Sequence, residues 1–158
     1  MKKIIFLIQL NREGKLKLIE SNDNIKESYL IKSKNSFKSA KILIENNQIE
    51  DSVPMIYYSM YNLLTALLYK CGIKCENHSG SIIMLKEIFD LDNSKIEFAK
   101  KERIDKQYYV DFKVTEKQVK DFLKIAEEFN SILYNFIERL NSKEITIYRE
   151  KLINMLKW

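Results

Sequence analysis

Residues that form turns are scarce in this chain: three glycines and one proline occur among 158 residues. A β-sandwich or β-barrel needs turn residues about every 8–12 positions, so this scarcity excludes both. Long uninterrupted elements are expected instead, which means helices. The length fits one domain spanning residues 1–158, long enough to bury a core.

Cysteine and histidine are scarce too, with two cysteines and one histidine in the whole chain. Cys71 and Cys75 lie four residues apart at a predicted helix end, where their Cα atoms would be near the upper limit for a disulfide. Together with His78 they are three possible zinc ligands, but a structural site needs a fourth ligand and their spacing matches no common zinc pattern. The sequence therefore predicts reduced thiols, no metal site and no cofactor.

No apolar run is long enough to cross a membrane, and the one near the start extends only from Ile4 to Ile8. No small-residue cleavage site follows it before the charged Arg12 and Glu13, so it does not resemble a signal peptide. We expect a cytoplasmic protein with no membrane partner. The secondary structure of residues 1–13 is not determined by the sequence, because five consecutive apolar residues fit either a short strand or a short helix.

Basic residues exceed acidic ones by 27 to 22, which gives a net charge of +5 at pH 7. This balance permits a partner that contains phosphate but does not require one, because the lysines are scattered along the chain beside Glu and Asp. A solvated helical surface of mixed charge is the favoured interpretation. Lys34, Lys38 and Lys41 line one predicted helix face, but this face lacks the interleaved aromatic residues of a single-stranded nucleic-acid site.

Apolar residues recur at three- and four-residue spacing in three long stretches, which predicts three long helices. They run from about residue 23 to 47, from 51 to 71 and from 115 to 140. The second is apolar over more than one face, which indicates the buried, central helix. Its Tyr57, Tyr58 and Tyr61 are interpreted as core residues rather than as a stacking platform.

Two shorter helices are predicted between the second and third long ones, over residues 79–90 and 94–103. Residues 104–114 show no clean period and are predicted to form a structured loop held by Tyr108, Tyr109 and Phe112. Residues 142–158 have the spacing of a C-terminal helical extension. Three long and two short helices joined by short connections predict an all-α, antiparallel up-and-down helical bundle.

Residues typical of helix ends mark the boundaries of these segments. Asn47 tolerates the turn geometry needed after the first long helix. Pro54 is expected in the first turn of the second long helix, where its missing N–H costs nothing. Gly72 is placed to end that helix in the left-handed conformation, and Thr115 with Gln118 forms a capping-box pattern for the third.

Several short motifs occur in an order and spacing that resemble the HEPN domain, a small helical bundle named from higher eukaryotes and prokaryotes. The resemblance extends from about Gly14 to about Leu140. Its parts are Ser39-Ala40-Lys41-Ile42-Leu43, Asp51-Ser52, Tyr57-Tyr58-Ser59-Met60-Tyr61, Gly72-Ile73, Asn77-His78-Ser79-Gly80, Arg103 with Tyr108 and Tyr109, and Ala126-Glu127-Glu128-Phe129. No single part is specific, but their order and spacing are hard to obtain by chance.

The resemblance implies a homodimer paired with a minimal nucleotidyltransferase, the two acting as toxin and antitoxin. Active members are metal-independent ribonucleases, with an arginine followed after four to six residues by a histidine at the end of an inner helix. His78 lies where this histidine is expected, but the positions permitted to the arginine hold Cys71, Gly72 and Ile73. Some members have a tyrosine two residues after the histidine, which the partner modifies, and here Gly80 occupies that position.

Cleaving RNA without a metal requires proton transfers and stabilisation of charge on the phosphorus oxygens. Histidine suits the first because its usual pKa lies near neutrality, and arginine suits the second because it binds phosphate oxygens in a fork. We therefore assign catalysis to His78, with Lys74 as a weaker substitute for the missing arginine. Since the chain has one histidine, acid–base catalysis by two would use His78 from two subunits.

Binding of RNA or a nucleotide is assigned to Lys70, Asn77, Ser79 and Arg103. Whether the chain is an enzyme stays open, because the missing arginine could leave a toxin whose ribonuclease activity is weak or lost. The protein could instead be a module that binds RNA or a nucleotide in a cleft between subunits without cutting it. It could also be an interaction subunit for a nucleotidyltransferase, and His78 could have only the structural role of bonding a backbone carbonyl.

Overall fold

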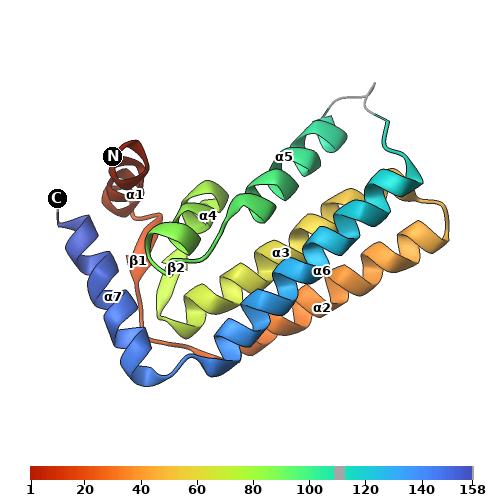
Figure 1. The fold of residues 1–158 in the computed structure, drawn as a ribbon. Coiled ribbons are helices and arrows are strands. Elements are labelled where there is room, and N and C mark those ends of the chain that lie inside the picture. The colour runs from red at the N-terminus through yellow and green to blue at the C-terminus, as the bar shows by residue number, and fades with distance from the viewer. Residues whose placement is uncertain (109–112, 158) are drawn as a thin grey trace.

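The computed structural model describes residues 1–108 and 113–157, which fold into seven helices and two short strands (Figure 1). The helices are α1 (Lys2–Arg12), α2 (Asp23–Glu45), α3 (Ile49–Lys70), α4 (His78–Glu87), α5 (Ser94–Tyr108), α6 (Glu116–Arg139) and α7 (Ser142–Leu156). The strands are β1 (Leu16–Leu18) and β2 (Ile73–Cys75). Within the described ranges, no helix is long and apolar enough to cross a membrane.

Helix α3 is the centre of the bundle, as its apolar sequence predicts. It packs against α2, α5 and α6, and 11 of its 22 residues are buried. These four helices run alternately up and down the long axis of the molecule (Figure 1). Side chains of α3 such as Ile56, Met60 and Leu64 are fully buried, and each contributes about 1.5–3 kcal/mol of hydrophobic stabilisation. The predicted all-α, up-and-down bundle is confirmed.

Most helix ends lie where the polar residues indicate them. Thr115 and Gln118 form the capping box of α6, in which each side chain bonds the other residue's backbone N–H. Asn47 has φ 58°, in the left-handed region that asparagine tolerates. The expected place of Pro54 is wrong, because α3 already begins at Ile49, directly after this turn, and Pro54 lies in its second turn. Its missing N–H leaves the Glu50 carbonyl without a helical donor, which costs little at an exposed residue.

Helix α5 is longer than the sequence indicates. It continues to Tyr108, so the loop expected from residue 104 is wrong over its first part. The end of α5 has no apolar period, but its Lys, Glu, Arg and Gln residues favour helix by intrinsic propensity and no Gly or Pro interrupts them. Tyr109, Phe112 and the side chain of Tyr108 lie outside the described residues.

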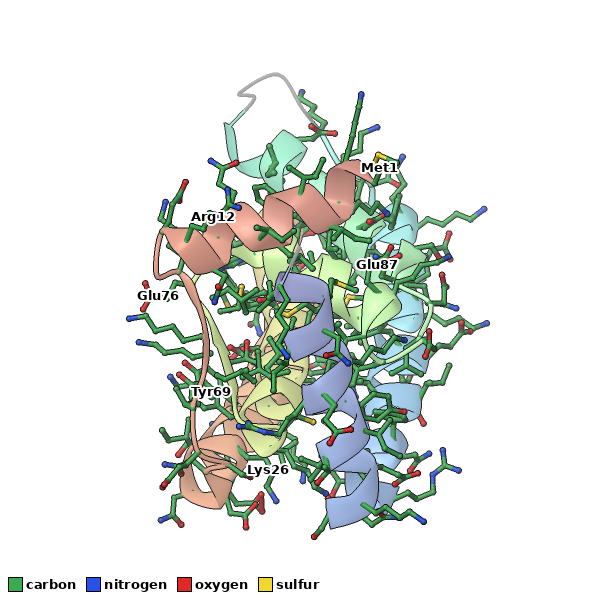
Figure 2. The ribbon with its side chains drawn as sticks, turned by 90° about the vertical axis from the view of Figure 1, so that its left-hand side faces the viewer. Met1, Arg12, Lys26, Tyr69, Glu76 and Glu87 are labelled. Carbon is green, nitrogen blue, oxygen red and sulfur yellow. The ribbon has the colours of Figure 1, made fainter. Side chains whose placement is uncertain are left out.

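A small layer at one end of the bundle positions the segment that follows α3. Strands β1 and β2 pair antiparallel, with Leu16 opposite Cys75 and Leu18 opposite Ile73. Helices α1 and α7 contact each other at this end, where both termini lie (Figure 1). Figure 2 views this end, with α1 extending from the label Arg12 to the label Met1 across the tip of α7. The segment near the start, which could have been a strand or a helix, is therefore the helix α1. The predicted C-terminal helix is confirmed as α7.

The turn from α3 into β2 depends on Gly72, which has φ 66° as predicted for a left-handed helix end. Arg149 of α7 holds this turn, because its Nη1 donates to the carbonyl oxygens of Ile19, Cys71 and Gly72 at 2.9, 2.8 and 2.7 Å. A Cβ on residue 72 would lie 2.5 Å from the Ile19 oxygen and would overlap Arg149. The path from α3 through β2 to His78 is therefore closely fixed.

Candidate functional site

His78 is the first residue of α4, shortly after the end of β2. Asn77 caps this helix, with its Oδ1 accepting from the backbone N–H of Gly80 at 2.9 Å. Gly80 packs so closely against α1 that a Cβ there would lie 2.5 Å from Leu10 Cδ1. A side chain at this position would therefore require the Leu10 side chain to move.

Two tyrosines of α3, four residues apart, orient the imidazole of His78. The Tyr57 hydroxyl lies 2.8 Å from Nδ1. The Tyr61 ring is stacked on the imidazole, with centroids 3.7 Å apart and planes within 12° of parallel. Tyr57 is fully buried, whereas His78 is only partly buried. Both the plane of the imidazole and the partner of Nδ1 are thus set by α3.

Two cationic side chains of α5 approach the same place. Lys100 Nζ donates to Ser79 Oγ, and the Arg103 guanidinium lies over the rings of Tyr57 and Tyr58, 5.0 and 5.7 Å from their centroids. Arg103 Nη1 also donates to the Tyr58 hydroxyl at 3.0 Å. Its Nε is buried without a hydrogen-bond partner among the described residues. Because Lys100 and Arg103 are three positions apart, α5 presents both on one face.

The charge state of His78 reflects these neighbours. Burial, together with the positive charges of Arg103 and Lys100, lowers the pKa of His78 to about 4. Burial and the Arg103 charge also lower the pKa of Lys100. The imidazole is therefore uncharged at pH 7 and lies near two cations, an arrangement that attracts an anion.

Four of the six residues predicted for the site gather at the start of α4 and the facing side of α5: Asn77, His78, Ser79 and Arg103. The other two have partners elsewhere. Lys74 lies opposite Lys17 in the small sheet and pairs with Glu76 at 2.8 Å, while Lys70 donates to the Ile137 carbonyl of α6. In the described part of the chain, no hydrogen bond or ion pair joins Lys70 or Lys74 to His78. Their roles in catalysis and binding stay predictions.

Sequence reasoning missed Lys100 and treated Tyr57 and Tyr61 only as core residues. The complete burial of Tyr57 confirms its place in the core, yet its hydroxyl also bonds His78. A signal for Lys100 was present, because it precedes Arg103 by three positions on one helix. No signal distinguished the tyrosines, since a ring in the core and a ring beside a site have the same helical spacing.

Cys71 directly follows α3, and Cys75 is the last residue of β2. Cys71 is fully buried, and burial raises the pKa of its thiol to about 12. Cys75 is partly buried, and its Sγ donates to the Asn77 carbonyl at 3.4 Å. Both are free thiols. Across residues 1–105 and 113–157, no group of three His, Cys, Asp or Glu side chains is arranged to hold a metal ion.

The fold and the site together define a class of protein. It is an all-α bundle with a histidine at the start of the short helix that follows the central helix, and with cations facing that histidine from the next helix. The family model of the HEPN domain matches residues 27–139. The chain therefore belongs to the HEPN domain family, and the predicted resemblance is confirmed.

Two similar proteins are both named UPF0332 protein. The one from Thermotoga maritima is 25% identical over 132 residues, which cover 77% of this chain and 98% of that protein. The one from Pyrococcus horikoshii is 38% identical over 58 residues, which cover 37% of this chain and 41% of that protein. The match thus spans less than half of the Pyrococcus protein and nearly all of the Thermotoga protein. Neither name states an activity, so function has to be argued from the site.

Proposed function

We propose that the site around His78 binds the phosphate backbone of RNA. The observation behind this proposal is that α5 places Lys100 and Arg103 near an uncharged imidazole at the start of α4. Ammonium and guanidinium groups neutralise phosphates in nucleic-acid sites. The net charge of +5 also favours the approach of a polyanion.

The cations of the site keep their charge available for a ligand. Among the described residues, neither Lys100 nor Arg103 lies within ion-pair distance of a carboxylate, although the charge of Glu97, which pairs with Lys3, acts on Lys100 and opposes the lowering of its pKa. Instead, Lys100 bonds the neutral Ser79 hydroxyl, and Arg103 is stacked over Tyr57 and bonded to the Tyr58 hydroxyl. These contacts orient the guanidinium without neutralising it, which suits the binding of phosphate oxygens.

We further propose that the protein is the toxin of a pair with a minimal nucleotidyltransferase and cleaves RNA slowly without a metal. Membership of the HEPN family supports this proposal, because active members are ribonucleases of this kind. Arg103 would take the place of the arginine that is missing ahead of His78 and stabilise charge on the phosphorus oxygens. One chain has one imidazole, so a second would come from a second subunit, and we propose a homodimer.

A second candidate function is a module that binds RNA or a nucleotide without cutting it. The lowered pKa of His78, about 4, favours this candidate. A base with so low a pKa accepts a proton poorly near pH 7, so it contributes little to general base catalysis there. The same site would then serve only for binding, in a protein whose main task is interaction with its nucleotidyltransferase partner.

Incubation of a labelled single-stranded RNA with the purified protein in EDTA tests these proposals. We expect binding by the wild type and slow cleavage that disappears in His78→Ala. Lys101→Met, which removes an exposed cation of α5, is the matched control and should behave as the wild type does. Cleavage that persists in His78→Ala would contradict the ribonuclease proposal. Binding without cleavage would select the second candidate, and no binding would contradict both.

A further inference from the structure

The hydrogen bond between Tyr57 and His78 determines which nitrogen of the imidazole faces a ligand. The Tyr57 hydroxyl lies 2.8 Å from Nδ1, and no residue that the structure describes bonds Nε2. In a neutral imidazole, one nitrogen has the proton and donates, while the other has a lone pair and accepts. The chemistry available at Nε2 therefore depends on which of these roles Nδ1 takes toward Tyr57.

The burial of Tyr57 determines whether Nδ1 donates to its hydroxyl or accepts from it. Its side chain is completely buried, and burial raises the pKa of its hydroxyl, so the hydroxyl keeps its proton. Nδ1 of His78 is its only hydrogen-bond partner in the described part of the chain. If Nδ1 had the proton and donated it to the Tyr57 oxygen, the Tyr57 O–H would be buried without an acceptor, which is unfavourable. The O–H of Tyr57 therefore donates to the Nδ1 lone pair.

We propose that Tyr57 is a positioning residue that holds neutral His78 in the tautomer with the proton on Nε2. His78 then presents an N–H donor to a ligand and has no free lone pair with which to abstract a proton, so this tautomer supports the candidate that binds RNA without cutting it and opposes a role of His78 as general base. This inference rests on the proposed phosphate site, which it deepens by assigning the imidazole nitrogen that donates to the phosphate. The site combines three donors, namely Nε2–H of His78, Lys100 and Arg103, and so selects a phosphate oxygen over a hydroxyl proton.

The charged and titratable groups around the imidazole also favour the neutral ring with its proton on Nε2. Arg103 and Lys100 of α5 oppose a second proton on the ring. The Tyr61 ring is stacked at 3.7 Å and holds the plane in which Nδ1 meets the Tyr57 hydroxyl. Since the charges keep the ring neutral and Tyr57 occupies Nδ1, the single proton of the imidazole is directed to Nε2.

Nitrogen-15 NMR reads this tautomer directly, and the chain offers an unusually simple case because it has one histidine. At pH 7, two-bond correlations from the ring protons distinguish a protonated ring nitrogen from one with a lone pair. In the wild type we expect the proton on Nε2 and an Nδ1 resonance shifted toward that of a hydrogen-bonded acceptor. An imidazole with its proton on Nδ1 would overturn the proposal.

Tyr57→Phe tests whether Tyr57 is responsible, and it keeps the buried ring so that the core stays filled. We expect the Nδ1 resonance to move toward that of a free acceptor and the Nδ1–H form to become populated. Tyr58→Phe, which removes the neighbouring hydroxyl that accepts from Arg103, is the matched control and should leave the tautomer as in the wild type. An Nδ1 resonance that is the same in Tyr57→Phe as in the wild type would overturn the positioning role.

Inorganic phosphate, added to the wild-type sample, separates this inference from the proposed function. We expect phosphate to shift the Nε2–H resonance, and to shift it less in Arg103→Met. A tautomer as proposed with no response to phosphate would contradict phosphate binding while supporting the assignment of the proton. A response to phosphate with the proton on Nδ1 would support binding and overturn the tautomer.

Discussion

The position, orientation and charge of His78 are set by three helices. Its backbone starts α4, its ring stacks on Tyr61 and bonds Tyr57 of α3, and its charge is suppressed by Lys100 and Arg103 of α5. The place of this histidine in the site could be predicted because it is the only histidine in the chain and lies where the HEPN motif has one. Its charge state could not be, because burial and the two charges arise only when α5 packs along α3.

The lowered pKa of His78 predicts how stability depends on pH. The folded protein has a pKa of about 4 at this residue, against 6.5 in an unfolded chain. Between these values the unfolded chain binds a proton that the folded one does not, so the free energy of unfolding decreases as pH decreases from 6.5 to about 4. The loss from this residue is at most about 3 kcal/mol, and below pH 4 it contributes no further loss.

Urea unfolding of the wild type and of His78→Gln across this pH range measures the contribution of His78 to the pH dependence of stability. The contribution of the carboxyl groups cancels in the comparison, because they titrate in both proteins. The glutamine keeps an acceptor for the Tyr57 hydroxyl but does not titrate. We expect the wild type to lose more stability than the variant between pH 6.5 and pH 4. Parallel curves for the two proteins would show that the histidine titrates normally.

At the scale of elements, the turn between α3 and β2 fixes where α4 begins. Gly72 adopts a left-handed conformation, and Arg149 of α7 bonds three carbonyl oxygens around it. The sequence predicts the glycine, since it follows the last apolar residue of a long helix. It does not predict the arginine, because nothing in the spacing of α7 indicates that one of its polar residues reaches a turn so far along the chain.

Gly72→Ala should therefore destabilise the fold by more than its backbone conformation alone explains. The left-handed conformation costs a non-glycine residue about 1–2 kcal/mol, and at residue 72 a Cβ would also meet the Ile19 oxygen and Arg149. Gly14→Ala is the matched control, because it has φ 71° but its Cβ would lie 3.4 Å from the flexible end of Lys17. Chemical denaturation should show a larger loss for Gly72→Ala, and equal losses would contradict the close packing of this turn.

Helix α5 shows why Lys100 was not predicted as a site residue. Apolar periodicity predicts α2, α3 and α6 well, because each buries a regular stripe against the others. The later part of α5 has no such stripe, so its helix was predicted to end at residue 103. The helix predicted over residues 94–103 already places Lys100 and Arg103 on one face, but that this face lies beside His78 follows only from the packing of α5 against α3.

At the scale of the whole molecule, the bundle brings a basic helix face to the histidine that the family motif places after α3. Helices α3 and α5 lie along each other, and α4 joins the end of α3 to the start of α5 (Figure 1). The positively charged partner of His78 thus comes from a later helix instead of from the positions just before it. The attraction of this site for phosphate can be separated by experiment from the general attraction of a basic protein for RNA.

The most direct test compares two double variants of α5 that remove the same charge. Lys100→Met with Arg103→Met removes the cations near His78, whereas Lys95→Met with Lys101→Met removes two for which the structure shows no contact with His78. Affinity for a fluorescent single-stranded RNA should decrease at least about tenfold in the first variant and only slightly in the second, after equal thermal stability is verified. Equal losses of affinity in the two variants would contradict a phosphate site at His78.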